Sequence, residues 1–113
     1  MKVHCPCGEW LKDDTDMRAR FADLLPHTNE DDYCETVAAA VQEHSDDPGI
    51  AAQYVIAETT RFFRCCCQCA SCGRLFVEDA QFQIHEFLPA NDLIPKSLLA
   101  AHTSQKITSA KNA

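Results

Sequence analysis

The sequence predicts a small α+β domain in which short antiparallel strands carry two cysteine turns, with a pair of helices inserted between the turns. The chain has 113 residues, enough for one modest core. "CPCG" begins at residue 5 and "CASCG" at residue 69, and helical patterns lie between them. We therefore expect one domain over residues 1–95, a helical insert at about 28–62, and a frayed extension over 96–113.

The N-terminal stretch "KVHCPCGEWLKD" has the pattern of a strand, a tight turn and a returning strand. Apolar and polar residues alternate, Pro6 and Gly8 favour the turn, and Trp10 leads the second strand. The following stretch "TDMRARFADLLPHTN" shows no sustained period. It is expected to form an irregular or short extended connector that ends at Pro26.

The first helix is expected over about residues 30–44. Thr28 or Asn29 is the expected N-cap, and acidic residues occupy the first turn, where the helix dipole favours them. The apolar residues spaced by four are Tyr33, Val37 and Val41.

A second helix is expected to follow after a short turn. Asp47 is its expected N-cap and Pro48 its first helical residue, a position that proline tolerates. The apolar residues that would share one face are Ile50, Tyr54 and Ala57.

The remaining ordered stretch, "RFFRCCCQCASCGRLFVEDAQFQIHEFLP", is predicted to return to extended structure. It contains the second cysteine turn, then a strand over residues 75–77, a turn near 79–81 and a strand over 82–88. Together with the N-terminal strands, these segments would form a small antiparallel sheet.

The chain has eight cysteines, and the expected compartment decides how they are interpreted. The N-terminus lacks a secretory apolar segment, and no apolar run reaches membrane-spanning length, so we expect a cytoplasmic protein without a membrane partner. Thiols stay reduced there, which favours metal binding or packing over disulfides.

The best metal-ligand set is Cys5, Cys7, Cys69 and Cys72. Each pair precedes a glycine, and a structural Zn²⁺ site is commonly built from two such pairs. The predicted architecture is therefore zinc-ribbon-like, with structural Zn²⁺ as cofactor. Iron in the same site, His4 as a substitute ligand, and reduced cysteines without metal remain alternatives.

The run "CCCQC" supplies more cysteines than one metal site needs. On an extended segment Cys65 and Cys67 would share a face with Cys69, while Cys66 would point away. We interpret these three as packing residues, and Cys34 on the first helix as part of the core. A second thiolate-rich site, or a redox relay between Cys67 and Cys69, is the alternative.

Both cysteine turns also carry a resemblance. "CPCG" near the start, a helical middle and "CxxCGRLFVED" late in the chain resemble small bacterial proteins of unassigned function that contain a split zinc ribbon. The resemblance covers about residues 1–90. It implies a zinc-ribbon fold with the four turn cysteines as ligands, implies no reaction, and does not extend to "CCCQC".

An enzymatic role is not expected. Four thiolates close the coordination shell, whereas catalytic zinc keeps one position open. The adjacent aspartate pairs suit caps and solvated turns. His85 and Glu86 would face opposite sides of the last strand and could not act together.

Charge points to a protein partner. Residues 9–58 contain thirteen acidic and three basic residues, within a chain of net charge −7. This favours a basic partner, and one hypothesis is that the protein is an immunity protein that inhibits a basic toxin or effector. The candidate partner-binding residues are Asp13, Asp14, Asp16, Glu30, Asp31, Asp32 and Glu35.

Two other function classes remain open. A nucleic-acid-associated zinc ribbon is supported by Arg61, Arg64 and Arg74, although the acidic insert makes nucleic acid the less favoured partner. A thiol-handling or metal-handling protein would use the surplus cysteines.

Overall fold

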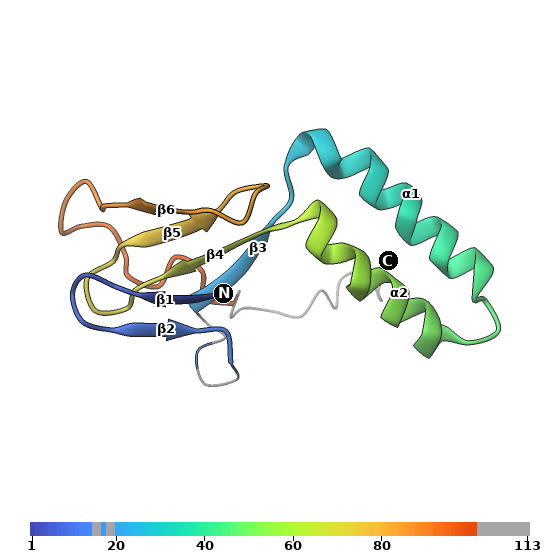
Figure 1. The fold of residues 1–113 in the computed structure, drawn as a ribbon, viewed down its shortest axis with the longest axis horizontal. Helices are drawn as coiled ribbons and strands as arrows, with labels where there is room; N and C mark the ends of the chain where they lie inside the picture. The colour runs from blue at the N-terminus through green and yellow to red at the C-terminus, as the bar shows by residue number, and fades with distance from the viewer. Residues whose placement is uncertain (15–16, 18–19, 102–113) are drawn as a thin grey trace, which may run out of the picture.

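The computed structural model describes residues 1–14, 17 and 20–101, and contains a ribbon of short strands from which a helical hairpin projects (Figure 1). Among the described residues, no helix is long and apolar enough to cross a membrane. The elements in chain order are β1 (Lys2–His4), β2 (Trp10–Lys12), β3 (Phe21–Leu24), α1 (His27–Glu43), α2 (Pro48–Phe62), β4 (Arg64–Gln68), β5 (Leu75–Glu78) and β6 (Ile84–Phe87).

The strands form two antiparallel sheets, so the predicted α+β class with a two-helix insertion is confirmed. β1 pairs with β2, and the second sheet has the order β3-β4-β5-β6. α1 and α2 lie between β3 and β4 in sequence, and they leave the sheet and return to it at neighbouring strands. The insertion therefore needs no crossover of the sheet.

The core lies between the two sheets and is small. Val3 and Leu11 from β1 and β2 pack against Cys67 of β4 and Phe76 of β5, and the buried cluster also includes Cys5 and Cys69. Leu11, Cys5, Cys67 and Cys69 are completely buried. Half of the six buried residues in this cluster are cysteines, so apolar burial alone gives the ribbon limited stability.

The two helices pack against each other, and this contact uses a different stripe of α2 from the one predicted. Ala51 and Phe62 are buried, whereas Ile50 and Tyr54 are largely exposed. Tyr54 instead stacks on His44, with ring centroids 4.6 Å apart. The prediction was wrong because each helix has a single packing partner, which covers only a narrow stripe.

The face of α1 follows the prediction in part. Tyr33 contacts Phe62 and Phe63 edge-on, with centroid distances of 5.6 and 4.9 Å. Val41, however, is 55% exposed, and Ala40 is the buried residue of that turn. Side chains spaced by four residues are each displaced by about 40° around an α-helix, so a line of such residues gradually leaves the interface with α2.

α1 also begins earlier than expected, at His27 rather than near residue 30. Its N-cap is Pro26, which provides no side-chain cap, so the prediction of Thr28 or Asn29 was wrong. The Asn29 side chain instead donates a hydrogen bond to the Phe62 carbonyl over 3.0 Å. This bond joins the start of α1 to the end of α2, the place where both helices meet the ribbon.

The larger sheet agrees with the expected short extended connector and differs from expectation in the start of its last strand. The connector contains β3, a strand that pairs with β4 over four residues from Phe21↔Cys67 to Leu24↔Arg64. The last strand starts at Ile84 rather than Phe82, because Phe82 lies in the preceding turn at φ +63°. In that turn the Asp79 carboxylate accepts hydrogen bonds from the Gln81 and Gln83 backbone N–H groups.

The segment after β6 returns across the second cysteine turn. Buried Gln68 donates hydrogen bonds to the carbonyls of Gly73 and Pro95, and its side-chain oxygen accepts one from the Leu98 N–H at 2.8 Å. Lys96 reaches the Ser71 carbonyl at 3.0 Å. Residues 96–98 of the extension predicted over 96–113 therefore contact the domain, and residues 102–113 lie outside the described residues.

The left-handed conformation of Phe82 gives a stability prediction. Phe82→Gly should raise the free energy of unfolding by about 1 kcal/mol, because the relieved backbone strain exceeds the added chain entropy. The ring is 62% exposed, so little packing is lost. Denaturant unfolding of the metal-loaded protein would measure the change.

Gln81→Gly is the matched control, because Gln81 lies in the same turn without a positive φ. It should lower the free energy of unfolding by about 0.5–1 kcal/mol. Equal losses in the two variants would contradict the strain argument.

Candidate metal centre

Two tight turns position the cysteines, one after β1 and one after β4. In the first turn, the Gly8 N–H donates to the Cys5 carbonyl over 2.8 Å, and in the second the Gly73 N–H donates to Cys69 over the same distance. Gly8 has φ +103° and Gly73 has φ +84°. Both turns need this conformation, which explains glycine after each cysteine pair.

The turns bring together the four sulfurs predicted as ligands. The Sγ atoms of Cys5, Cys7, Cys69 and Cys72 all lie within 4.8 Å of one another. The shortest separations join the two turns: Cys5 to Cys72 is 3.4 Å, and Cys7 to Cys69 is 3.5 Å. The first turn therefore presents both of its sulfurs although only one residue separates them.

These separations suit a metal ion better than disulfide bonds. All four cysteines are free thiols. A tetrahedron with metal–sulfur bonds of 2.3 Å has sulfur–sulfur edges of about 3.8 Å. The observed positions match this size to within about an ångström, so the cluster can hold one tetrahedral ion without a rearrangement of the turns.

Backbone N–H groups point at the sulfurs, as expected where thiolates must be stabilised. Cys5 accepts a hydrogen bond from the Cys7 N–H. Cys69 accepts from the N–H groups of Ser71 and Cys72, and Cys72 accepts from the N–H of Arg74. The tight turns thus serve both to place the sulfurs and to stabilise negative charge on them.

The thiols of the cluster differ in acidity. Burial raises the pKa of Cys5 to about 12 and also raises the pKa of Cys69. Burial acts in the same direction on Cys72, but hydrogen bonds from the Arg74 backbone and guanidinium, and from Cys5 and Cys69, lower its pKa to about 6. Without a metal, Cys72 is therefore a thiolate at neutral pH while Cys5 and Cys69 hold their protons.

These shifts in thiol pKa make both the stability of the fold and the metal affinity depend on pH. Cys72 stabilises the fold above pH 9, the ordinary pKa of a cysteine, and this contribution is lost as the pH falls toward 6. Metal binding must also displace protons from Cys5 and Cys69. Metal affinity should therefore fall as the solution becomes more acidic.

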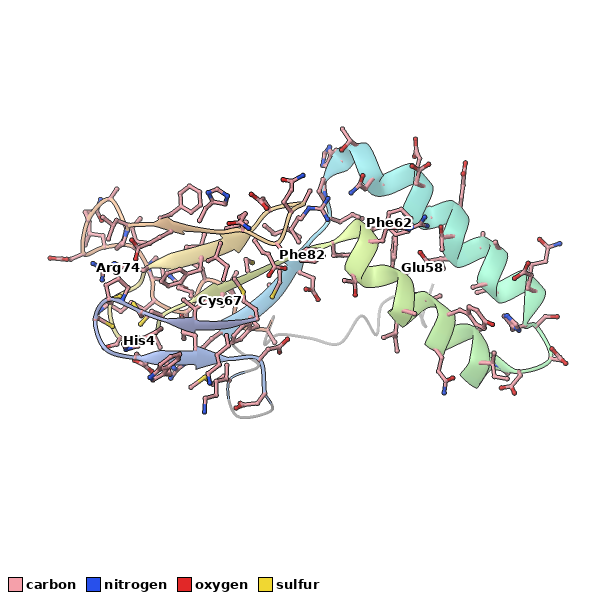
Figure 2. All side chains as sticks on the ribbon, in the orientation of Figure 1. His4, Glu58, Phe62, Cys67, Arg74 and Phe82 are labelled. Carbon is pink, nitrogen blue, oxygen red and sulfur yellow. The ribbon has the colours of Figure 1, made fainter. Side chains whose placement is uncertain are left out.

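Arg74 provides the nearest positive charge. Its guanidinium lies 3.3 Å from the Cys72 Sγ, and its Nε lies 3.3 Å from a Glu86 carboxylate oxygen (Figure 2 labels Arg74 beside the turn). The contact with Glu86 is an ion pair by distance, but it is not aligned as a hydrogen bond. Glu86 therefore restrains Arg74 and leaves its other nitrogens for the sulfur.

A second charge pair borders the cluster on the side of β2. Glu9 and Arg20 form an ion pair at 2.6 Å, and the other Glu9 oxygen lies 3.9 Å from the Cys69 Sγ. Arg20 offsets the carboxylate charge beside the thiols. This pair joins the first cysteine turn to the connector that leads into β3.

The alternative ligands lie elsewhere. His4 stacks on Trp10 on the exposed face of β1 and β2, with ring centroids 4.4 Å apart. Cys66 and Cys67 are fully buried, as packing residues would be. Among the described residues, no second group of metal-ligating side chains includes the Cys65–Cys67 run. The prediction that Cys34 is a core residue was wrong, because Cys34 is exposed on α1.

The acidic candidates fall into separate groups. Glu30, Asp31, Asp32 and Glu35 lie in the first turns of α1 and are exposed. Asp13 and Asp14 follow β2 on the ribbon, and Asp16 lies outside the described residues. Their role in partner binding stays a prediction.

The arginines cited for a nucleic-acid surface are each engaged within the chain. Arg61 pairs with Glu58 at 2.9 Å, and Arg64 donates to the backbone carbonyls of Arg61 and Phe63.

His85 and Glu86, neighbours on β6, have different partners. His85 pairs with Asp79, and Glu86 pairs with Arg74, so their side chains face opposite ways.

One exposed feature was missed. The outer face of β1 and β2 carries Lys2 and Lys12 opposite each other and His4 opposite Trp10. The Lys2 ammonium lies 5.0 Å from the centre of the Trp10 ring. The alternation in "KVH" and "WLK" contained this signal, because the buried Val3 and Leu11 place the other four residues on one face.

Comparisons with protein-family models, with curated proteins and with solved structures found no match.

The ligand assignment gives a direct prediction. Protein purified without chelators should contain one metal ion per chain, measured by elemental mass spectrometry. Cys69→Ser should lose the metal because it removes one of four clustered sulfurs, whereas Cys67→Ser should keep it. Metal loss in both variants, or more than one ion per chain, would contradict the assignment.

The contact of Arg74 with sulfur gives a second prediction. Arg74→Met should lower metal affinity by about 10-fold to 100-fold, the usual effect of removing a group that supports a ligand. A chromogenic chelator competition would measure it. Arg64→Met is the control, since the Arg64 guanidinium donates to the backbone carbonyls of Arg61 and Phe63; equal losses would exclude the proposed effect on Cys72.

Proposed function

We propose that this protein is a non-enzymatic zinc ribbon that holds a projecting, acidic helical hairpin for binding to a basic protein partner. The ribbon is the rigid base and residues 27–62 are the docking element. The observation that carries the proposal is the separation of charge between these two parts.

Zinc is the metal that the donor set favours. Four cysteine sulfurs in a compact group are the usual ligands of structural Zn²⁺, although iron binds the same set. A shell closed by four protein ligands leaves no position for substrate, which supports a structural role. Binding would close chain segments of more than sixty residues, between Cys7 and Cys69 and between Cys5 and Cys72.

The helical hairpin carries the negative charge of the protein. Residues 27–62 contain eight acidic residues and one basic residue, a net charge of −7 that equals the charge of the whole chain. The rest of the chain is neutral in sum. A concentrated field of one sign speeds the capture of an oppositely charged protein.

The position of the hairpin suits such capture. α1 and α2 extend from one end of the ribbon and are not covered by either sheet (Figure 1). Large apolar side chains are exposed on them, with Ile56 at 69% and Val41 at 55%. An interface usually combines such apolar contacts with a charged rim. The inhibitor hypothesis is a special case, in which the basic partner is a toxin or another effector.

A second candidate function has one specific observation in its favour. The exposed face of β1 and β2 combines Trp10 and His4 with Lys2 and Lys12. Aromatic rings beside cations bind single-stranded nucleic acid by stacking and by neutralising phosphates. With two lysines this face is small, so we rank it below the hairpin.

One affinity experiment tests both candidates. Tagged, metal-loaded protein is used to capture partners from its native source, alongside a variant with Asp31→Asn, Asp32→Asn and Glu35→Gln, and a separate Trp10→Ala variant. We expect a stoichiometric basic protein that is retained by Trp10→Ala, is lost with the triple variant, and binds more weakly at high salt.

Other results would decide against the hairpin. Equal recovery of the partner by the triple variant would show that the acidic turns of α1 are not the docking surface. Recovery of nucleic acid that depends on Trp10 would favour the second candidate. Recovery of generic chaperones alone would contradict both.

A further inference from the structure

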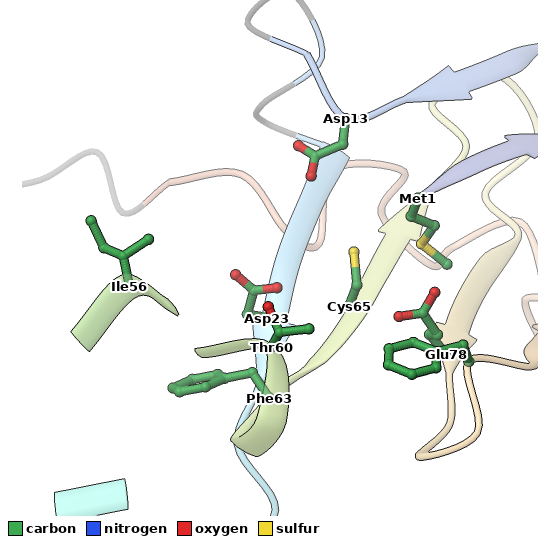
Figure 3. A pocket seen from close by; sticks show the side chains of 9 residues that line it. Met1, Asp13, Asp23, Ile56, Thr60, Phe63, Cys65 and Glu78 are labelled. Carbon is green, nitrogen blue, oxygen red and sulfur yellow. The ribbon is translucent and has the colours of Figure 1, made fainter. Parts of the chain in front are cut away.

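A hollow lies where the helical hairpin joins the ribbon (Figure 3). It has a volume of about 470 Å³, within the range of about 300–1,000 Å³ that ligand sites occupy. Figure 3 shows residues from α2, β3, β4 and β5 around it. The lining residues are Met1, Asp13, Asp23, Ile56, Thr60, Phe63, Cys65, Glu78 and Phe82.

One part of this cavity is apolar and partly aromatic. Ile56 and Phe63 line it from the helical side, and Phe82 lines it from the β5–β6 turn. The Phe82 ring is 62% exposed even though its backbone occupies a conformation that phenylalanine rarely adopts. The cavity therefore offers ring faces and alkyl groups to a ligand.

Another part is acidic. Asp13, Asp23 and Glu78 come from three separate segments, and the charges of all three act on the Cys65 thiol at the floor of the cavity. Within the described part of the chain, none of these three carboxylates has an ion-pair or side-chain hydrogen-bond partner. The N-terminal ammonium group acts on the same thiol with the opposite sign.

We propose that this cavity receives an arginine or lysine side chain of a protein partner, with the cationic head among Asp13, Asp23 and Glu78 and the stem against Phe63 and Phe82. Long basic side chains combine an alkyl stem with a charged end, and cations are attracted to aromatic faces. A cationic group matches the three carboxylates in charge, whereas an anionic ligand would be repelled by them.

Other uses of the cavity fit the geometry less well. The carboxylates do not meet closely enough to form a metal-binding group; in the described chain the only such group is the cysteine cluster. A covalent role for Cys65 is not favoured, because burial and the nearby carboxylates raise the pKa of its thiol to about 11. Reversible binding of a cation is the chemistry that remains.

This inference deepens the proposed function, since it gives the basic partner a specific contact beside α2. The cavity is distinct from the acidic turns of α1, where Asp32 and Glu35 line a separate hollow with Arg61. The two proposals can therefore fail independently, and different variants test them.

The test uses the full, metal-loaded chain and two short peptides. One has the sequence acetyl-Gly-Ser-Arg-Ser-Gly-amide, and the other carries citrulline, which is neutral and nearly isosteric, in place of arginine. Backbone-amide NMR titration at low ionic strength gives the affinity and the residues affected. We expect millimolar binding of the arginine peptide, with shifts at Phe63, Cys65 and Phe82, and at least about fivefold weaker binding of the citrulline peptide.

Variants locate the site. Asp23→Asn with Glu78→Gln should weaken binding about fivefold or more, whereas Glu30→Gln with Asp31→Asn, which removes the same charge on α1, should change it less than about twofold. Phe82→Gly should weaken binding about threefold through the loss of the ring. Because glycine accepts the φ of +63°, a loss of folding is not expected in that variant.

Several outcomes would overturn the proposal. Equal binding of the two peptides, equal effects of the two charge variants, or no binding at all would each do so. Binding seen only after removal of residues 102–113, which include Lys106 and Lys111, would identify the chain's own basic residues as the occupant. If the peptide binds as expected while no protein is captured by the hairpin, the cavity proposal stands and the proposed function fails.

Discussion

The meeting of four cysteine sulfurs is the constraint on which the rest of the structure depends. β1 and β2 form their own sheet, so no strand ladder connects them to β4 and β5. What joins the two sheets is a small core, half of it cysteine, together with the sulfur cluster. A core of this size gives little stability by itself, and an ion held by all four sulfurs would supply folding energy directly. Arg74 and backbone N–H groups donate hydrogen bonds to sulfurs of this cluster. The charge on the thiolates is therefore coupled to the stability of the fold.

That arrangement leaves the helical hairpin structurally separate. α1 and α2 bury their narrow common stripe against each other and reach the ribbon through β3 and β4, with Asn29 bonded to Phe62 at the junction. The helical hairpin does not contribute to the core between the sheets, so its surface residues can be charged without unfolding the ribbon. This explains how the hairpin can concentrate a charge of −7. The junction itself, lined by Phe63, Phe82 and three carboxylates, combines surface from both parts.

The unusual cysteine run can now be divided by position along β4. Cys67 faces the core beside the four-cysteine cluster, and Cys66 is buried on the opposite face of the sheet. Cys65 shares the face of Cys67 but lies further along the strand, where the core ends and the cavity begins. Small apolar side chains fit both faces of a strand that is covered on each side. The run therefore spans a change of environment along one strand.

The sequence by itself determined the fold class, the two helices and the four cysteines that come together, because glycine-terminated turns and the Asp47–Pro48 helix start are local signals. It did not determine which helix stripe is buried, since Ala51 and Phe62 were chosen by the single packing partner that each helix has. Nor could it show that Asp13, Asp23 and Glu78 share one cavity, or that Cys34 is exposed. Those features depend on contacts between segments distant in the chain, and side-chain spacing within one element contains no information about what covers it.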